Sequence, residues 1–104
     1  MSTFDSLVDI AKGRRKKFPQ GNNPHIILAR LLEEAGELAQ TVNHYEGISS
    51  KDRTKAEKTD IAKESVDVIQ NVLALLIQYN LLEEFDHEVE SSKQKLKEDG
   101  FLEK

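Results

Sequence analysis

Hydrophobic residues recur every three or four positions along most of the chain, the spacing of one face of an α-helix. A first helix is predicted over residues 3–18, where Phe4, Leu7 and Ile10 precede the basic run 14–17. A second helix is predicted over residues 24–45, because Asn23 suits an N-cap and Pro24 the first helical position. Its apolar residues form one continuous arc from Ile27 to Tyr45.

The third predicted helix, over about 55–79, is apolar around most of its circumference from Val66 onward. Its one polar stripe consists of Asp60, Glu64, Asp67 and Asn71. A helix of this kind must be covered on most sides, and 104 residues provide few helices to cover it. We therefore expect self-association, as a homodimer or homotetramer. A cap at residues 80–83 starts a more polar fourth helix that ends near Gly100.

Composition narrows the class of protein. Two prolines, five glycines and long helical periods predict an all-α fold, and 104 residues suffice for a single domain over 1–104. The net charge of −4 argues against a protein that coats nucleic acid polymers, and the lack of cysteine excludes disulfides and thiolate zinc sites. Without a recognisable signal peptide or an apolar run long enough to span a bilayer, we expect a cytoplasmic protein with no membrane contact.

Two pairs of acidic residues lie on neighbouring predicted helices. Glu34 and Glu37 adjoin the apolar arc of the second helix, whereas Glu64 and Asp67 belong to the polar stripe of the third. Acids three residues apart project from nearly the same side of a helix. If the two helices run antiparallel, the pairs can face each other, and a divalent cation would offset their repulsion. Oxygen ligands without His or Cys select Mg²⁺ or Mn²⁺ over zinc.

At these residues the sequence resembles the MazG-like all-α nucleotide pyrophosphohydrolases. The signature of that family is Glu-Glu-x-x-Glu on one helix and Glu-x-x-Asp on the next, matched here by residues 33–37 and 64–67. The resemblance implies a four-helix, MazG-like bundle with antiparallel central helices, completed by oligomerisation. It also implies magnesium-dependent hydrolysis of the α–β bond of a nucleoside triphosphate, giving a monophosphate and pyrophosphate.

The resemblance assigns roles to the acidic residues: Glu34, Glu37, Glu64 and Asp67 as metal ligands, with Glu33 as a nearby support. Glu37 or Glu33 would accept the proton of the attacking water, and the spacing does not separate a base from a ligand. The candidate substrate-binding residues are Arg30, Asn71, Lys93, Lys97 and the basic run 14–17, with contacts across a subunit boundary allowed.

Each of these assignments has a purely structural alternative. Arg30 lies one turn before Glu34 and can pair with it, while Lys93 and Lys97 suit a solvated surface. The basic run also matches the negative end of a helix dipole. On these alternatives the chain is a non-catalytic helical dimerisation or interaction module. Among enzymes, the nucleotide stays open, with relatives that act on dUTP or phosphoribosyl-ATP as further possibilities.

Overall fold

The computed structural model describes residues 2–48 and 56–103, which form four α-helices and one short 3₁₀ turn. The helices are α1 (Thr3–Lys17), α2 (Pro24–Tyr45), α3 (Lys58–Gln78) and α4 (Leu82–Glu98), and the 3₁₀ turn η1 (Pro19–Gly21) joins α1 to α2. The described residues contain no strand, so the all-α prediction is confirmed for them.

Local sequence signals set the ends of the first two helices. The Ser2 hydroxyl accepts a hydrogen bond from the Asp5 amide at 3.1 Å and so caps α1. The Asn23 side chain accepts from the His25 amide at 2.8 Å, which confirms the predicted cap of α2. After α2 the chain turns at Gly47, whose φ of +75° is a conformation that favours glycine.

The boundaries of α3 and α4 differ from the prediction. The Glu57 amide donates to the Asp60 carboxylate at 2.9 Å, and α3 begins directly after Glu57, at Lys58. The predicted start near residue 55 lies outside the described residues, and residues 56 and 57 are not helical. Asn80 does not cap α4, because it has a φ of +56° and follows the end of α3. The asparagine therefore marks the turn between the two helices.

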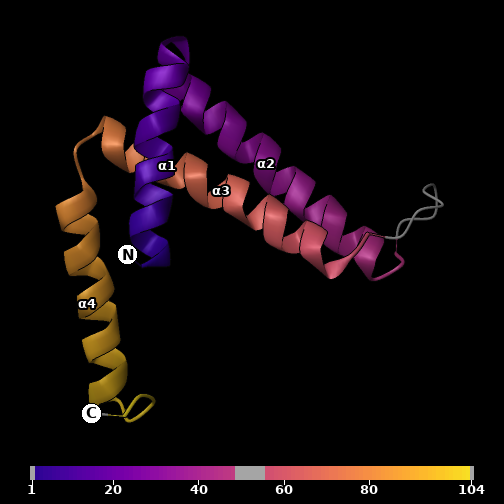
Figure 1. Ribbon diagram of the computed structural model, residues 1–104. Helices are drawn as coiled ribbons and strands as arrows, with labels where there is room; N and C mark the ends of the chain where they lie inside the picture. The colour runs from indigo at the N-terminus through magenta and orange to yellow at the C-terminus, as the bar shows by residue number, and fades with distance from the viewer. Residues whose placement is uncertain (1, 49–55, 104) are drawn as a thin grey trace.

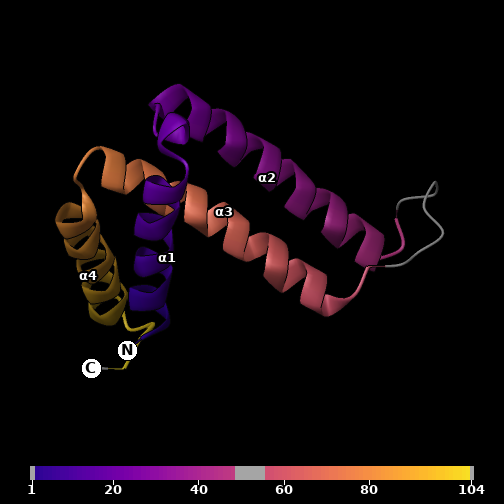
Figure 2. The ribbon, with the colours of Figure 1, turned by 45° about the horizontal axis from the view of Figure 1, so that its top comes forward.

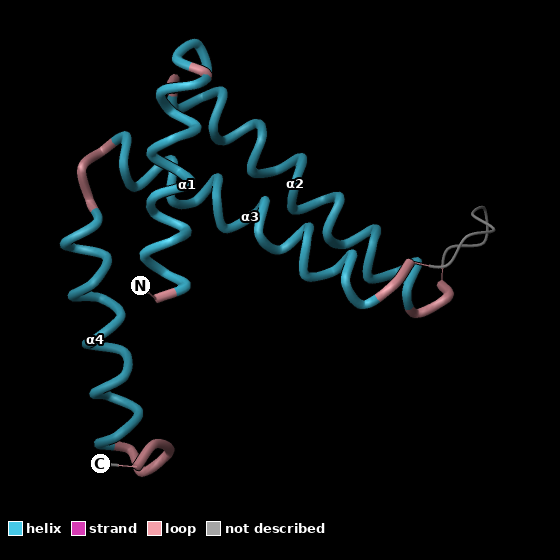
Figure 3. The backbone as a smooth tube through the Cα atoms, viewed as in Figure 1, coloured by secondary structure: helices cyan, strands magenta, loops and turns pink. Residues whose placement is uncertain are grey.

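The centre of the molecule is the pair formed by α2 and α3, which lie side by side along much of their lengths (Figure 1). The end of α2 and the start of α3 are at the same end of this pair (Figures 1 and 3). α1 crosses α3, and the Gln70 side chain of α3 donates to the Leu7 carbonyl of α1 at 3.0 Å. Ala11, Ile27 and Leu73 from these three helices form the fully buried apolar core.

α4 extends from the far end of α3 and lies on the same side of it as α1 (Figure 2). The rings of Phe4 and Phe85 stack between α1 and α4 with their centroids 6.2 Å apart. No single described helix has both the length and the apolarity of a membrane span. α3 and α4 taken together meet those two criteria but are bent by 120° where they join.

The single chain is open rather than closely packed. Its radius of gyration is 16.8 Å, whereas a compact domain of this length has about 13 Å. Several large apolar side chains lie exposed on one face of α2, among them Leu28, Leu32 and Val42, with Leu32 75% exposed. One chain therefore buries only part of its apolar surface, because α4 does not fold back to cover α2.

Candidate metal centre

Three glutamates from the central helix pair form the candidate metal centre. Glu34 and Glu37 come from successive turns of α2, and Glu64 comes from the neighbouring part of α3. One carboxylate oxygen from each lies within 4.8 Å of the others. The spacing of three residues brings Glu34 and Glu37 to one side of α2, and the packing of α2 on α3 adds Glu64.

The environment of these carboxylates favours a positive charge between them. The Oε2 atoms of Glu34 and Glu64 are buried, and neither has a hydrogen-bond partner among the residues that the structure describes. Burial raises the pKa of Glu34 above its ordinary value of 4.5, and repulsion from Glu37, Asp67 and Glu64 raises it further. Buried polar atoms in proteins are normally paired, so these two oxygens are suited to a bound cation.

Asp67 lies beside this cluster but is not one of its three closely spaced residues. Its carboxylate is 4.0 Å from the Arg14 guanidinium, and its side chain is 34% exposed. The negative charge of Asp67 nevertheless contributes to the raised pKa of Glu34. Asn71 donates from its side chain to the Asp67 backbone carbonyl at 2.9 Å, one turn back along α3. Asp67 thus stands between the glutamates and a positively charged side chain.

The structure places the other predicted site residues differently. Glu33 is exposed on α2, next to Glu34 in the chain. Arg30 donates to the Gly21 carbonyl at 2.7 Å rather than pairing with Glu34, because η1 folds back against the start of α2. Lys93 and Lys97 lie in the second half of α4, which points away from the α2–α3 pair (Figure 1). Within one chain these lysines therefore do not reach the glutamates, and a contact across a subunit boundary stays a prediction.

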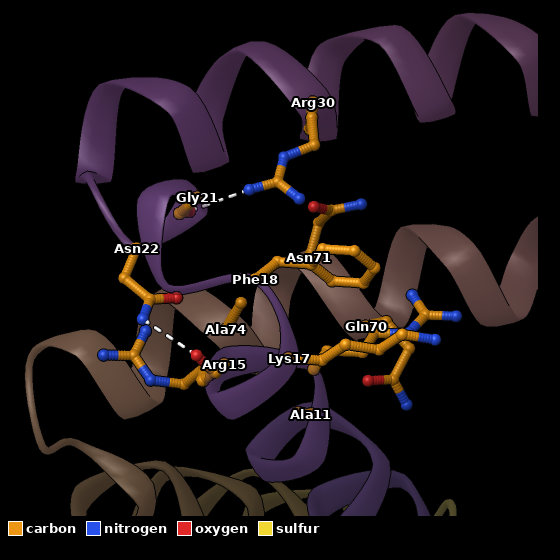
Figure 4. A pocket seen from close by; sticks show the side chains of 11 residues that line it. Ala11, Arg15, Lys17, Phe18, Gly21, Asn22, Arg30, Gln70, Asn71 and Ala74 are labelled. Atoms are coloured by element: carbon orange, nitrogen blue, oxygen red, sulfur yellow. Dashed lines mark hydrogen bonds between the residues drawn. The ribbon is translucent and has the colours of Figure 1, made fainter.

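A pocket of about 330 Å³ lies where α1, η1, α2 and α3 meet. Its charged lining residues are all basic: Arg14, Arg15, Lys17 and Arg30. Polar lining is added by Asn22, Gln70 and Asn71. Figure 4 shows Arg15 and Asn22 on one side of the pocket and Gln70 on the other, with Arg30 and Asn71 lying between α2 and α3. Arg14 lines the pocket, and its guanidinium is 4.0 Å from the carboxylate of Asp67, the acidic residue beside the cluster.

Gln70 is a buried polar residue of the pocket that the sequence pattern alone did not indicate. It is only 2% exposed, and although its amide nitrogen is bonded to Leu7, its Oε1 atom has no partner. The sequence does contain a signal for Gln70, because its side-chain amide lies between Ile69 and the apolar run that begins at Val72. A polar group in such a position must find a hydrogen-bond partner when it is buried.

Comparisons of the chain with protein-family models, with curated proteins and with solved structures found no match. Function is therefore inferred from the chemistry of the site.

Proposed function

We propose that this protein is a magnesium-dependent nucleoside triphosphate pyrophosphohydrolase, which releases a nucleoside monophosphate and pyrophosphate. The main support is the pair of buried, unpartnered carboxylate oxygens of Glu34 and Glu64, with Glu37 within 4.8 Å. Three ionised carboxylates held this closely repel one another, and a cation between them, or a proton on Glu34, relieves that repulsion. The MazG-like pattern of residues 33–37 and 64–67 gives the same reading by resemblance.

The donor set indicates the kind of metal. Each of the three residues offers oxygen, and neither histidine nor cysteine belongs to the cluster. Hard oxygen donors of this kind suit Mg²⁺, with Mn²⁺ as a substitute, better than zinc. When bound, the metal supplies neutralisation of phosphate charge and a lowered pKa for water. Glu34, Glu37 and Glu64 would hold it, with Asp67 as the proposed fourth ligand.

The reaction requires a water oxygen to bond to the α-phosphorus while the bond from that phosphorus to the α–β bridging oxygen breaks. Pyrophosphate leaves with the bridging oxygen, and a carboxylate of the protein takes the proton of the water. Glu37 and Glu33 are the candidates for this base, because both are exposed on α2 beside the half-buried Glu34. No covalent intermediate with the protein is needed. Arg30 and Asn71 are proposed to bind the substrate from the adjoining pocket.

Self-association is part of the proposal, with a MazG-like bundle of antiparallel central helices completed by a second chain. The open shape of one chain and the exposed apolar face of α2 support it. Covering Leu28, Leu32 and Val42 with a second copy would bury apolar surface that α4 leaves open. In such an assembly, Lys93 and Lys97 of one chain would bind phosphates held by its partner.

The test is a nucleotide panel assayed for pyrophosphate release with millimolar MgCl₂ or MnCl₂ and with EDTA. We expect metal-dependent release from at least one nucleoside triphosphate, together with an equal amount of the monophosphate. Glu37→Gln should abolish turnover, whereas Glu83→Gln, the same chemical change on exposed α4, should leave it intact. If no nucleotide is hydrolysed with either metal, the proposed function is wrong.

A second candidate function is a non-catalytic helical interaction module. The exposed apolar residues of α2 favour it, because they require a partner whether or not the protein is an enzyme. Metal dependence separates the two functions. If the protein is such a module, Glu34 and Glu64 do not bind a metal ion, so MgCl₂ should not raise its melting temperature.

A further inference from the structure

We propose that the basic pocket beside the glutamates is a preformed binding site for a phosphate group of the substrate, and that it binds phosphate without metal. Its assignment to substrate phosphate rests on the proposed function. The pocket is formed by the end of α1, by η1, by the first half of α2 and by the middle of α3 (Figure 4). Its volume of about 330 Å³ is at the lower end for ligand pockets, which suits one part of a nucleotide.

Two of the four basic side chains that line this pocket, Arg15 and Arg30, are held by hydrogen bonds. The Arg30 guanidinium donates to the Gly21 carbonyl at 2.7 Å, and a Cβ atom at residue 21 would collide with that guanidinium. Arg15 donates from Nη2 to the Gln78 side chain at 2.9 Å, which ties α1 to α3. Arginines fixed in this way lose little side-chain freedom when an anion binds, and their planar geometry matches phosphate oxygens.

Two atoms around the pocket still need a ligand. The second terminal nitrogen of Arg15, Nη1, is buried and has no hydrogen-bond partner. Oε1 of Gln70 is in the same state, on a side chain that is 2% exposed. Both atoms are covered by neighbouring atoms, so a side-chain shift is needed before a ligand reaches them. After such a shift, a phosphate oxygen would accept from Arg15, and a hydroxyl group of a nucleotide or a protonated phosphate would donate to Gln70. The charged side chains of the lining are all basic, so an anion meets no like charge there.

The position of the pocket links it to the reaction. Arg30 lies one helical turn before Glu34 on α2, and Asn71 lies one turn after Asp67 on α3. Both side chains line the pocket, so it continues the acidic cluster along the same two helices. A phosphate chain that extends across this boundary would have one phosphate among the arginines and another beside the glutamates. The arrangement separates binding of the anion from binding of the metal.

Isothermal titration calorimetry in EDTA and low salt tests this inference with two ligands, inorganic pyrophosphate and a nucleoside monophosphate. We expect at least one to bind, and which one binds distinguishes the leaving-group end of the substrate from the nucleoside end. Arg30→Gln should weaken that binding by about tenfold or more, as expected for a lost charged hydrogen bond. Lys16→Gln is the matched control, since it removes one charge from the same basic run outside the pocket and should have little effect.

Arg14→Gln provides a second variant on a side chain that is 53% exposed, so the conclusion does not depend on whether Arg30→Gln folds. It should also weaken binding severalfold. The inference is overturned if neither ligand binds without metal, or if Lys16→Gln weakens binding as much as the two pocket variants do.

Failure of this inference is distinguishable from failure of the proposed function. If the pocket binds phosphate as expected and no triphosphate is hydrolysed, the pocket stands and the enzyme does not. If Mg²⁺-dependent hydrolysis occurs while Arg30→Gln and Arg14→Gln alter neither KM nor metal-free binding, the enzyme stands and the pocket is wrong. Glu37→Gln should abolish hydrolysis and leave metal-free phosphate binding unchanged.

Discussion

The charge of Glu34 should destabilise the metal-free protein, and Glu34→Gln tests this. The substitution keeps the size of the side chain and one oxygen but removes the negative charge. Glu34 lies against α3 with an unpartnered buried oxygen and three acidic neighbours, Glu37, Glu64 and Asp67. In the unfolded chain this crowding is absent. Removing the charge therefore relieves repulsion in the folded state alone.

The size of the effect follows from the spacing of the carboxylates. Two unit charges 4.8 Å apart repel by about 0.9 kcal/mol in water and by about 3.5 kcal/mol at an effective dielectric constant of 20. Glu37 is exposed, so its contribution to the repulsion lies toward the lower figure. We expect Glu34→Gln to stabilise the metal-free protein by about 1–2 kcal/mol near pH 7.

The assay is thermal and urea unfolding at one fixed protein concentration, in EDTA and again in millimolar MgCl₂. For a chain of this length, 1–2 kcal/mol corresponds to a rise of about 4–8 °C in Tm. The wild-type protein should gain stability from MgCl₂, and Glu34→Gln should lose most of that gain because a ligand is missing. A variant less stable than wild type in EDTA, or one that keeps the full response to MgCl₂, would refute the reasoning.

Four further outcomes are expected. In EDTA, wild-type stability should rise as pH falls through the raised pKa of Glu34 toward its ordinary value of 4.5, because the folded state binds the proton more tightly than the unfolded state. Glu34→Gln should lose this rise in a pH series of urea unfolding curves. Asp67→Asn should lose pyrophosphate release while its circular dichroism spectrum stays helical. Leu32→Asp, on a side chain 75% exposed in one chain, should lower the mass measured by light scattering if α2 forms the subunit interface. Leu73→Ala should cost about 2–5 kcal/mol of unfolding free energy, since Leu73 is 2% exposed in the core.

Part of the candidate site could be predicted from local spacing. A separation of three residues on a helix determines that Glu34 and Glu37 share one side, whatever the rest of the fold does. Glu64 joins them only because α2 packs on α3, and the apolar arcs of both helices predict that packing. The partner of Arg30 could not be predicted in this way, because Gly21 lies in a turn whose course depends on how α1 crosses α3.

The sequence by itself determined the helices, since caps such as Ser2 and Asn23 and the period of apolar residues act within a few positions of the chain. It also determined that Glu34 and Glu37 border the apolar arc of α2. Only the tertiary structure decided that two glutamate oxygens become buried without partners and that arginines gather in a pocket beside them. The physical reason is that burial, electrostatic repulsion and pocket shape arise from residues far apart in the chain, and their distances are set when the helices pack.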